Sequence, residues 1–172
     1  VANDHIFEAV AEDRLNQDAE GPAYEILNFA VNGYSVIQYA MVTESIVKDF
    51  EPDAIFVPMH TADNRRLMEY LRRIVKRQIP IPYPDLHNII YDTGVTAQME
   101  SSEMERALLP ILDNISEWSY ERISAFCKAH DIAPVWFLMP MTDENEKLND
   151  RPKVEQMETL ARRLGFATLS LE

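Results

Sequence analysis

The chain has 172 residues, of which 47% are hydrophobic, and its formal net charge is −13. This length and apolar fraction are typical of one globular domain with its own hydrophobic core. The acidic charge repels phosphate groups, which argues against nucleic acid as a partner. No apolar run of the sequence approaches the roughly 20 residues of a membrane span, so none is predicted.

The predicted elements begin with a helix and a strand. Apolar residues recur at helical spacing over residues 6–15, before a break at Gly21-Pro22. Residues 24–31 are rich in β-branched and aromatic side chains, which predicts a strand. Residues 35–50 return to helical spacing. The order helix, strand, helix is typical of an α/β protein.

The next elements repeat this order. Residues 54–58 are wholly apolar, which predicts a strand buried on both faces, as in a parallel sheet. Residues 64–78 have the pattern of a basic amphipathic helix. Residues 79–113 are rich in proline and then acidic, so we expect an excursion from the core, part loop and part short helix. It is either a lid over the sheet edge or a surface insertion without a role.

Regular spacing resumes after the excursion. It predicts a helix at 110–130, a strand at 134–140, a polar loop to 151, a helix from 152 to 164 and a strand at 167–171. The whole alternation predicts a single α/β domain over the chain. Its sheet is expected to be parallel and doubly wound, with helices on both faces.

Metal and cofactor sites are not indicated. The single cysteine, Cys127, excludes an intrachain disulfide and a multi-cysteine metal site. The histidines His5, His60, His87 and His130 have no spacing typical of metal ligands. The sequence also lacks G-x-G-x-x-G, G-x-x-x-x-G-K-[ST] and G-x-S-x-G. We therefore predict no metal and no cofactor.

Polar, turn-forming residues follow two of the predicted strands. Asn32-Gly33 ends the first strand, and the residues HTAD at 60–63 end the second. Because the carboxyl ends of parallel strands meet at one edge of a sheet, we expect a site at that edge. Glycine at such a turn lets a backbone N–H face a ligand; the alternative is a plain tight turn.

The stretch EILNFAVNGYSVIQ, followed by a helix and then PDAIFVPMHTAD, resembles the SGNH (GDSL-type) hydrolase superfamily. The resemblance extends to RLNQ upstream and to LARRLGFATLSL near the end of the chain. It implies a flavodoxin-like, three-layer sandwich that hydrolyses a carboxylic ester, as an esterase, lipase or deacetylase. The family's first block, Gly-Asp-Ser, and its last block, Asp-x-x-His, do not occur in this sequence.

The resemblance also implies roles for the second block. Gly33 falls on the family glycine whose backbone N–H helps to form the oxyanion hole. Asn32 and Ser35 flank this glycine and are expected to cap the turn and the following helix rather than to contact substrate.

The third block departs from the family pattern Gly-x-Asn-Asp. Aligned with it, residues 60–63 place Ala62 where the family has an oxyanion asparagine. Asn64 lies two positions later and would need a register shift to take that role. His60 either donates a hydrogen bond in place of the asparagine or only orders the loop. Asp63 matches the family aspartate, which braces the loops.

No catalytic residue is therefore expected within the chain, which is predicted to be inactive by itself. None of its serines has an activating neighbour in the sequence. If the resemblance holds, the nucleophile strand precedes Val1 and the Asp/His pair follows Glu172. That strand is central in the strand order 2-1-3-4-5, so the predicted strands at 24–31 and 54–58 lose their shared neighbour without it. A longer parent chain is favoured over a rewired sheet or a strand from another polypeptide.

Two functions of different classes follow. The first is hydrolysis of a small-molecule or glycan ester by Ser-His-Asp chemistry supplied outside these residues. The alternative, favoured by Ala62, is an inactive SGNH-like module that binds an acylated glycan or a protein partner. A flavodoxin-like receiver or cofactor module is a weaker third, because neither an acidic phosphoacceptor pocket nor flavin loops are visible. The sequence indicates neither a compartment nor an oligomeric state.

Overall fold

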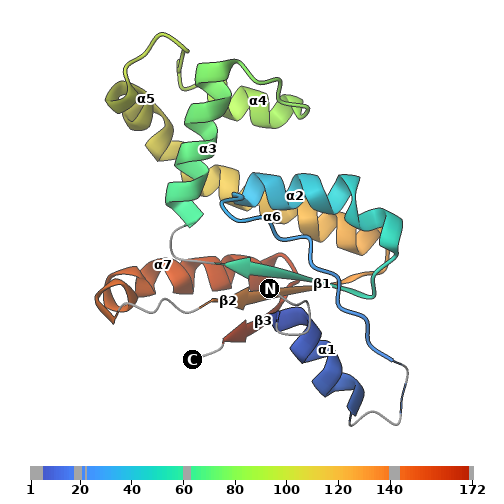
Figure 1. Cartoon of the computed structure of the whole chain (residues 1–172). Helices are drawn as coiled ribbons and strands as arrows, with labels where there is room; N and C mark the ends of the chain where they lie inside the picture. The colour runs from blue at the N-terminus through green and yellow to red at the C-terminus, as the bar shows by residue number, and fades with distance from the viewer. Residues whose placement is uncertain (1–5, 18–20, 22, 60–62, 140–143, 171–172) are drawn as a thin grey trace. The chain divides into compact units, whose positions relative to one another are not determined.

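The structure is a computed structural model that describes residues 6–17, 21, 23–59, 63–139 and 144–170, except the side chains of 144–151 and 170 (Figure 1). The chain divides into two compact units, Val1–Asn32 and Gly33–Glu172. The single domain predicted over the whole chain stays a prediction. Among the described residues, no helix has both the length and the apolar character needed to cross a membrane.

The larger unit contains a parallel sheet, three-stranded in its described part. The strands lie in the order β1 (Ala54–Met59), β2 (Ala133–Leu138) and β3 (Ala167–Ser170). β1 pairs with β2 over its full length, from Ala54 opposite Ala133. The predicted α/β fold with a parallel sheet is confirmed. The flavodoxin-like strand order, with a central strand missing, stays a prediction.

The main helices of this unit lie close to the predicted positions. They are α2 (Val36–Ser45), the 3-10 turn η2 (Val47–Phe50), α3 (Asp63–Arg77), α6 (Leu112–Ala129) and α7 (Glu144–Arg163). α2 begins after Ser35, whose backbone N–H donates to Oε1 of Gln38 at 3.1 Å, as in a capping box. α7 begins earlier than predicted, so residues 144–151 are helical rather than a loop.

The two faces of the sheet differ in burial. The buried face belongs to one hydrophobic cluster with residues of α2, α6 and α7; its sheet members are Val57, Met59, Trp136 and Leu138. On the opposite face, Phe56 of β1 is 59% exposed. The prediction that residues 54–58 are buried on both faces is therefore wrong, because successive side chains of this strand meet different surroundings. Helices on both faces of the sheet stay a prediction.

The excursion at 79–113 is mostly helical. It contains α4 (Pro84–Tyr91), α5 (Ser101–Leu108) and η3 (Leu109–Ile111), and Figure 1 shows α4 and α5 near the carboxyl end of α3. Its buried side chains in the hydrophobic cluster are Leu86, Ile90, Val95, Met104, Leu108 and Leu112. The excursion is thus part of the core rather than a surface insertion. Its role as a lid stays a prediction.

A charged and aromatic cluster fixes the start of the excursion to α2 and α6. Arg122 Nη2 lies 2.7 Å from Oε1 of Glu44, and its guanidinium lies 4.4 Å from the ring centroid of Tyr83. Tyr83 Oη donates to Oε2 of Glu44 at 2.7 Å. Burial and this bond to a carboxylate raise the pKa of Tyr83 to about 12. The cluster combines an ion pair with a cation–π contact.

In the smaller unit, the helix expected at 6–15 is confirmed as α1 (Phe7–Gln17). The strand expected at 24–31 is wrong, because residues 23–31 adopt no regular secondary structure. Leu27 and Val31 are 45% and 50% exposed. A strand requires a partner for its backbone groups, and no strand pairs with this segment in the described part of the chain.

Side chains of α1 bind the backbone of this segment instead. Asn16 accepts the N–H of Tyr24 at 2.7 Å and donates to its carbonyl at 2.9 Å. Glu12 accepts the N–H of Ile26 at 2.8 Å. Glu12 and Asn16 are four residues apart on the helix, a rise of about 6 Å. Tyr24 and Ile26 are two residues apart on an extended chain, a rise of about 6.6 Å, so the two spacings match. The segment is therefore held extended along α1.

Candidate functional site

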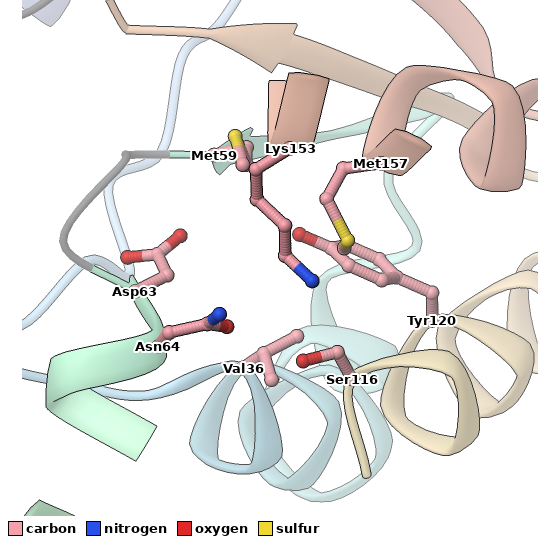
Figure 2. A pocket seen from close by; sticks show the side chains of 8 residues that line it. All are labelled: Val36, Met59, Asp63, Asn64, Ser116, Tyr120, Lys153 and Met157. Carbon is pink, nitrogen blue, oxygen red and sulfur yellow. The ribbon is translucent and has the colours of Figure 1, made fainter. Parts of the chain in front are cut away.

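A small cavity lies where β1 ends and α3 begins (Figure 2). It is lined by Val36, Met59, Asp63, Asn64, Ser116, Tyr120, Lys153 and Met157. These residues come from the start of α2, the end of β1, the start of α3 and the inner sides of α6 and α7. The volume is about 20 Å³, somewhat more than one water molecule needs.

The turn at Gly33 precedes the helix that reaches this cavity. Gly33 has φ +83°, a left-handed conformation that other L residues rarely adopt. A Cβ added there would meet no described atom within 4 Å. Val36, the first residue of α2, lies in the cavity wall. The turn itself is therefore present, while a ligand-facing N–H of Gly33 stays a prediction. Asn32 is exposed in the same turn.

Of the predicted residues at 60–64, only Asp63 and Asn64 are described, and both line the cavity. His60 and Ala62 lie outside the described residues, so their roles stay predictions. Asp63 begins α3 and pairs with Arg66 at 3.1 Å, one turn later. An acidic residue in the first turn is favourable for a helix. Figure 2 shows the amide of Asn64 directed toward the cavity.

Two hydroxyl groups of α6 point into the cavity from the side opposite α3 (Figure 2). Ser116 and Tyr120 are four residues apart, one helical turn, and are 4% and 2% exposed. Burial, and then the negative charge of Asp63, raises the pKa of Tyr120 far above its ordinary value. Tyr120 therefore keeps its proton at neutral pH and remains a hydrogen-bond donor.

Lys153 brings a positive charge to the cavity from α7. Its Nζ pairs with the carboxylate of Asp113 on α6. The Lys153 side chain is 24% exposed and that of Asp113 is 54% exposed, so the pair lies where the cavity approaches the surface. Figure 2 shows the Lys153 side chain extending toward Tyr120 and Ser116.

Sequence reasoning did not find these groups. Ser116 is one of the serines without an activating neighbour in the sequence, and the sequence predicts no role for Tyr120 or Lys153. The usable signal is the spacing of two hydroxyl side chains, 116 and 120, on the apolar side of a predicted helix. Lys153 carries no such signal, because its position in the cavity wall depends on how α7 packs against the rest of the unit.

A second, shallow depression lies on the outer side of α3. It is lined by Glu69, Arg72, Arg73 and Lys76. Lys76 already donates to the carbonyl oxygens of Ala97 and Met99, at 3.1 and 2.6 Å, and so holds the loop before α5. The polar groups of this depression do not converge on an enclosed space. The cavity at the start of α3 is therefore the candidate site.

Within the part of the chain that the structure describes, no three His, Cys, Asp or Glu side chains are grouped as a metal site would need. No family model, curated protein or solved structure matches the chain. The fold and the cavity together define an α/β protein with a parallel sheet and a small cavity, lined by apolar and polar side chains, at the carboxyl end of a strand. This position is where open α/β sheets bind ligands.

Proposed function

We propose that the chain is part of an SGNH-like hydrolase that cleaves a carboxylic ester. The observation that carries this proposal is the cavity at the carboxyl end of β1, where Asn64, Tyr120 and Lys153 place hydrogen-bond donors. Ester cleavage requires donors at such a position, because negative charge develops on the carbonyl oxygen. The ordered resemblance of the sequence to the superfamily supports the same assignment.

The proposed reaction follows the serine hydrolase sequence. A serine supplied by residues outside this chain attacks the acyl carbon while a histidine, oriented by an aspartate, accepts the serine proton. The tetrahedral intermediate collapses, and the histidine returns the proton to the departing alcohol. Water then attacks the acyl-enzyme in the same way and releases the carboxylic acid.

Two donors of this chain would stabilise the oxyanion. The backbone N–H of Gly33 is one, supported by its left-handed turn and the open space around it. The second is the amide of Asn64, which points into the cavity and replaces the asparagine missing at Ala62. Asp63, paired with Arg66, would hold the start of α3 in place. His60 stays an alternative donor.

The nucleophile would enter on a strand beside β1. In the described part of the larger unit, β1 is an edge strand whose outer backbone groups pair with no other strand. A parallel strand along this edge would end beside the start of α3. Backbone pairing supports this position, because strand groups left without partners are costly when they are buried.

The test compares two proteins. The longer parent protein is assayed with a short-chain aryl ester, with and without a serine-reactive phosphonate, and the 172-residue chain is the matched control. We expect turnover and phosphonate labelling in the parent protein and neither in the control. Absence of both from the parent protein would overturn the hydrolase proposal.

Two substitutions test whether the second oxyanion donor is the amide of Asn64 or the imidazole of His60. Asn64→Ala in the parent protein should lower kcat by about 100- to 1000-fold, the cost of losing one oxyanion donor. His60→Ala should then have a much smaller effect. The reverse ranking would assign the second donor to His60 and would contradict the role of Asn64.

The second candidate is an inactive module that binds an acylated glycan or a protein partner. Alanine at position 62 favours it, because this residue type removes the side-chain donor of the family pattern. Sequencing upstream of Val1 distinguishes the two candidates. A Gly-Asp-Ser block there supports catalysis, and its absence supports binding without catalysis.

A further inference from the structure

The outer side of α3 is basic, although the chain as a whole is acidic. The helix has six basic and two acidic side chains, and its buried side is apolar, so the charged side chains share the opposite side. Since α3 contributes +4 to the formal net charge of −13, the other residues contribute −17. We call the basic side chains of this helix the basic face of α3; they are Arg65, Arg66, Arg72, Arg73, Lys76 and Arg77.

Contacts within the chain explain half of this basic face. Arg66 pairs with Asp63 at 3.1 Å. Lys76 donates to two carbonyl oxygens of the loop before α5, at 3.1 and 2.6 Å. Arg77 lies in the last turn of α3, where the helix dipole favours a positive charge. The other three arginines need a different explanation.

These three, Arg65, Arg72 and Arg73, form no ion pair with any carboxylate that the structure describes. On α7, by contrast, Arg162 and Arg163 each pair with a glutamate. A guanidinium group presents its N–H donors in a planar fork that matches the two oxygens of a carboxylate. The three arginines are therefore free to bind carboxylates of another molecule.

The shallow depression on this side of α3 gives the basic groups a common surface. It is lined by Glu69, Arg72, Arg73 and Lys76. All four side chains are charged, so the depression suits a charged partner rather than an apolar one. From Arg65 to Lys76 the helix rises about 16 Å. A partner helix with acidic residues at every third or fourth position presents carboxylates at the same spacing.

We propose that the basic face of α3 binds an acidic segment of a partner protein. Charge complementarity supports this partner, and the charge of the remaining residues argues against larger polyanions. Nucleic acid or an anionic membrane extends well beyond α3 and would be repelled by the other residues, which carry −17. A second copy of the chain, with its own charge of −13, is disfavoured for the same reason. This inference goes beyond the proposed hydrolase function and does not rest on it.

The test measures binding of the 172-residue chain to a fluorescent peptide by anisotropy. The peptide is a helix former of about eleven residues, as long as the basic face, with glutamate at every third or fourth position. The same peptide with glutamine at these positions is the matched control. We expect saturable binding of the glutamate peptide that weakens as the salt concentration rises from about 0.05 to 0.5 M, because salt screens exposed charges. The glutamine peptide should not bind.

Charge variants locate the binding surface. Arg72→Glu combined with Arg73→Glu should weaken peptide binding about tenfold or more, since each change replaces an exposed attraction with a repulsion. Glu69→Gln removes the repelling carboxylate of the depression and should strengthen binding about 2- to 5-fold. Arg162→Glu combined with Arg163→Glu changes the net charge equally on α7 and should alter binding less than about twofold. Circular dichroism checks folding, and the gain expected for Glu69→Gln decides if the first double variant does not fold.

Three results would overturn the inference. Absence of saturable binding at low salt would mean that the basic face is only a solvated helix surface. Equal weakening by the α7 double variant would mean that net charge, rather than this face, determines binding. A single-stranded oligonucleotide of the same charge is titrated in parallel. If it binds more tightly than the peptide and responds to the same α3 variants, the face recognises phosphate instead of an acidic protein segment.

Discussion

Two apolar runs with the same kind of sequence have different structures. Residues 24–31 and β1 (Ala54–Met59) are both rich in β-branched and aromatic side chains. β1 pairs along its whole length with β2, and its residues Val57 and Met59 are buried. The run at 24–31 has no regular structure. A partner strand, rather than β-propensity, therefore determines which run becomes a strand.

The two runs also satisfy their backbone groups differently. β1 uses the ladder of a parallel sheet, whereas Tyr24 and Ile26 use side chains of α1, Asn16 and Glu12. A ladder is cooperative, because each pair of residues positions the next pair. Bonds to exposed side chains are individual and weak, each about 0.5–1.5 kcal/mol. We expect the two runs to respond very differently to the same perturbation.

The largest expected effect is on stability. Trp136→Ala removes a side chain that is 1% exposed and packs on the buried sheet face, so it should lower the free energy of unfolding by about 3–5 kcal/mol. Leu27→Ala removes a side chain that is 45% exposed and should cost less than about 1 kcal/mol. Urea unfolding followed by circular dichroism measures both. Equal losses would mean that residues 24–31 pack as part of a core.

The fold could be predicted from the sequence where the signal is local. The apolar spacing of β1, β2 and the main helices is enough to locate them, because each buries one side against its neighbours. The run at 24–31 could not be predicted in this way. The residue types of this run favour a strand. Strand pairing, however, depends on residues far away in the sequence, so the run itself does not indicate whether a partner strand is present.

Some residues of the candidate site could likewise be predicted from the sequence, and others could not. Asp63 and Asn64 could be found from the sequence, because polar residues after a predicted strand lie at the carboxyl edge of a sheet. For Tyr120 the sequence offers only its spacing from Ser116 on a predicted helix, and for Lys153 it offers no signal, because both side chains reach the cavity from helices far along the chain, α6 and α7. Only the packing of these helices against β1 brings the side chains together.

Thiol labelling provides a second comparison, between the buried core of the larger unit and the segment at residues 24–31. Cys127 is fully buried, and burial raises its pKa from about 9 to about 11, which lowers its thiolate fraction at pH 8 by about 100-fold. The thiolate is the reactive form, so the native chain should react slowly with iodoacetamide. In Leu27→Cys, the added thiol at an exposed position should react at least 100-fold faster. Mass spectrometry of digested samples measures both rates.

Denaturant provides the control for this labelling. In urea both cysteines should react at similar rates, because unfolding removes the burial that raises the pKa of Cys127. Fast labelling of native Cys127 would contradict a closed core beneath β2. Slow labelling of Leu27→Cys would mean that the segment is covered in solution.

The smallest expected effect concerns single amides of the segment. The N–H groups of Tyr24 and Ile26 donate to α1 and should exchange with solvent more slowly than that of Leu27. Asn16→Ala removes both bonds to Tyr24 and should accelerate exchange at that amide by about 2- to 10-fold, since one exposed bond contributes about 0.5–1.5 kcal/mol. Ile26 keeps Glu12 and should change less. Hydrogen exchange followed by NMR resolves these amides, and the amides of β1 serve as the reference that Asn16→Ala leaves unchanged. Uniform protection across 24–28, insensitive to Asn16, would show that a ladder and not α1 holds this segment.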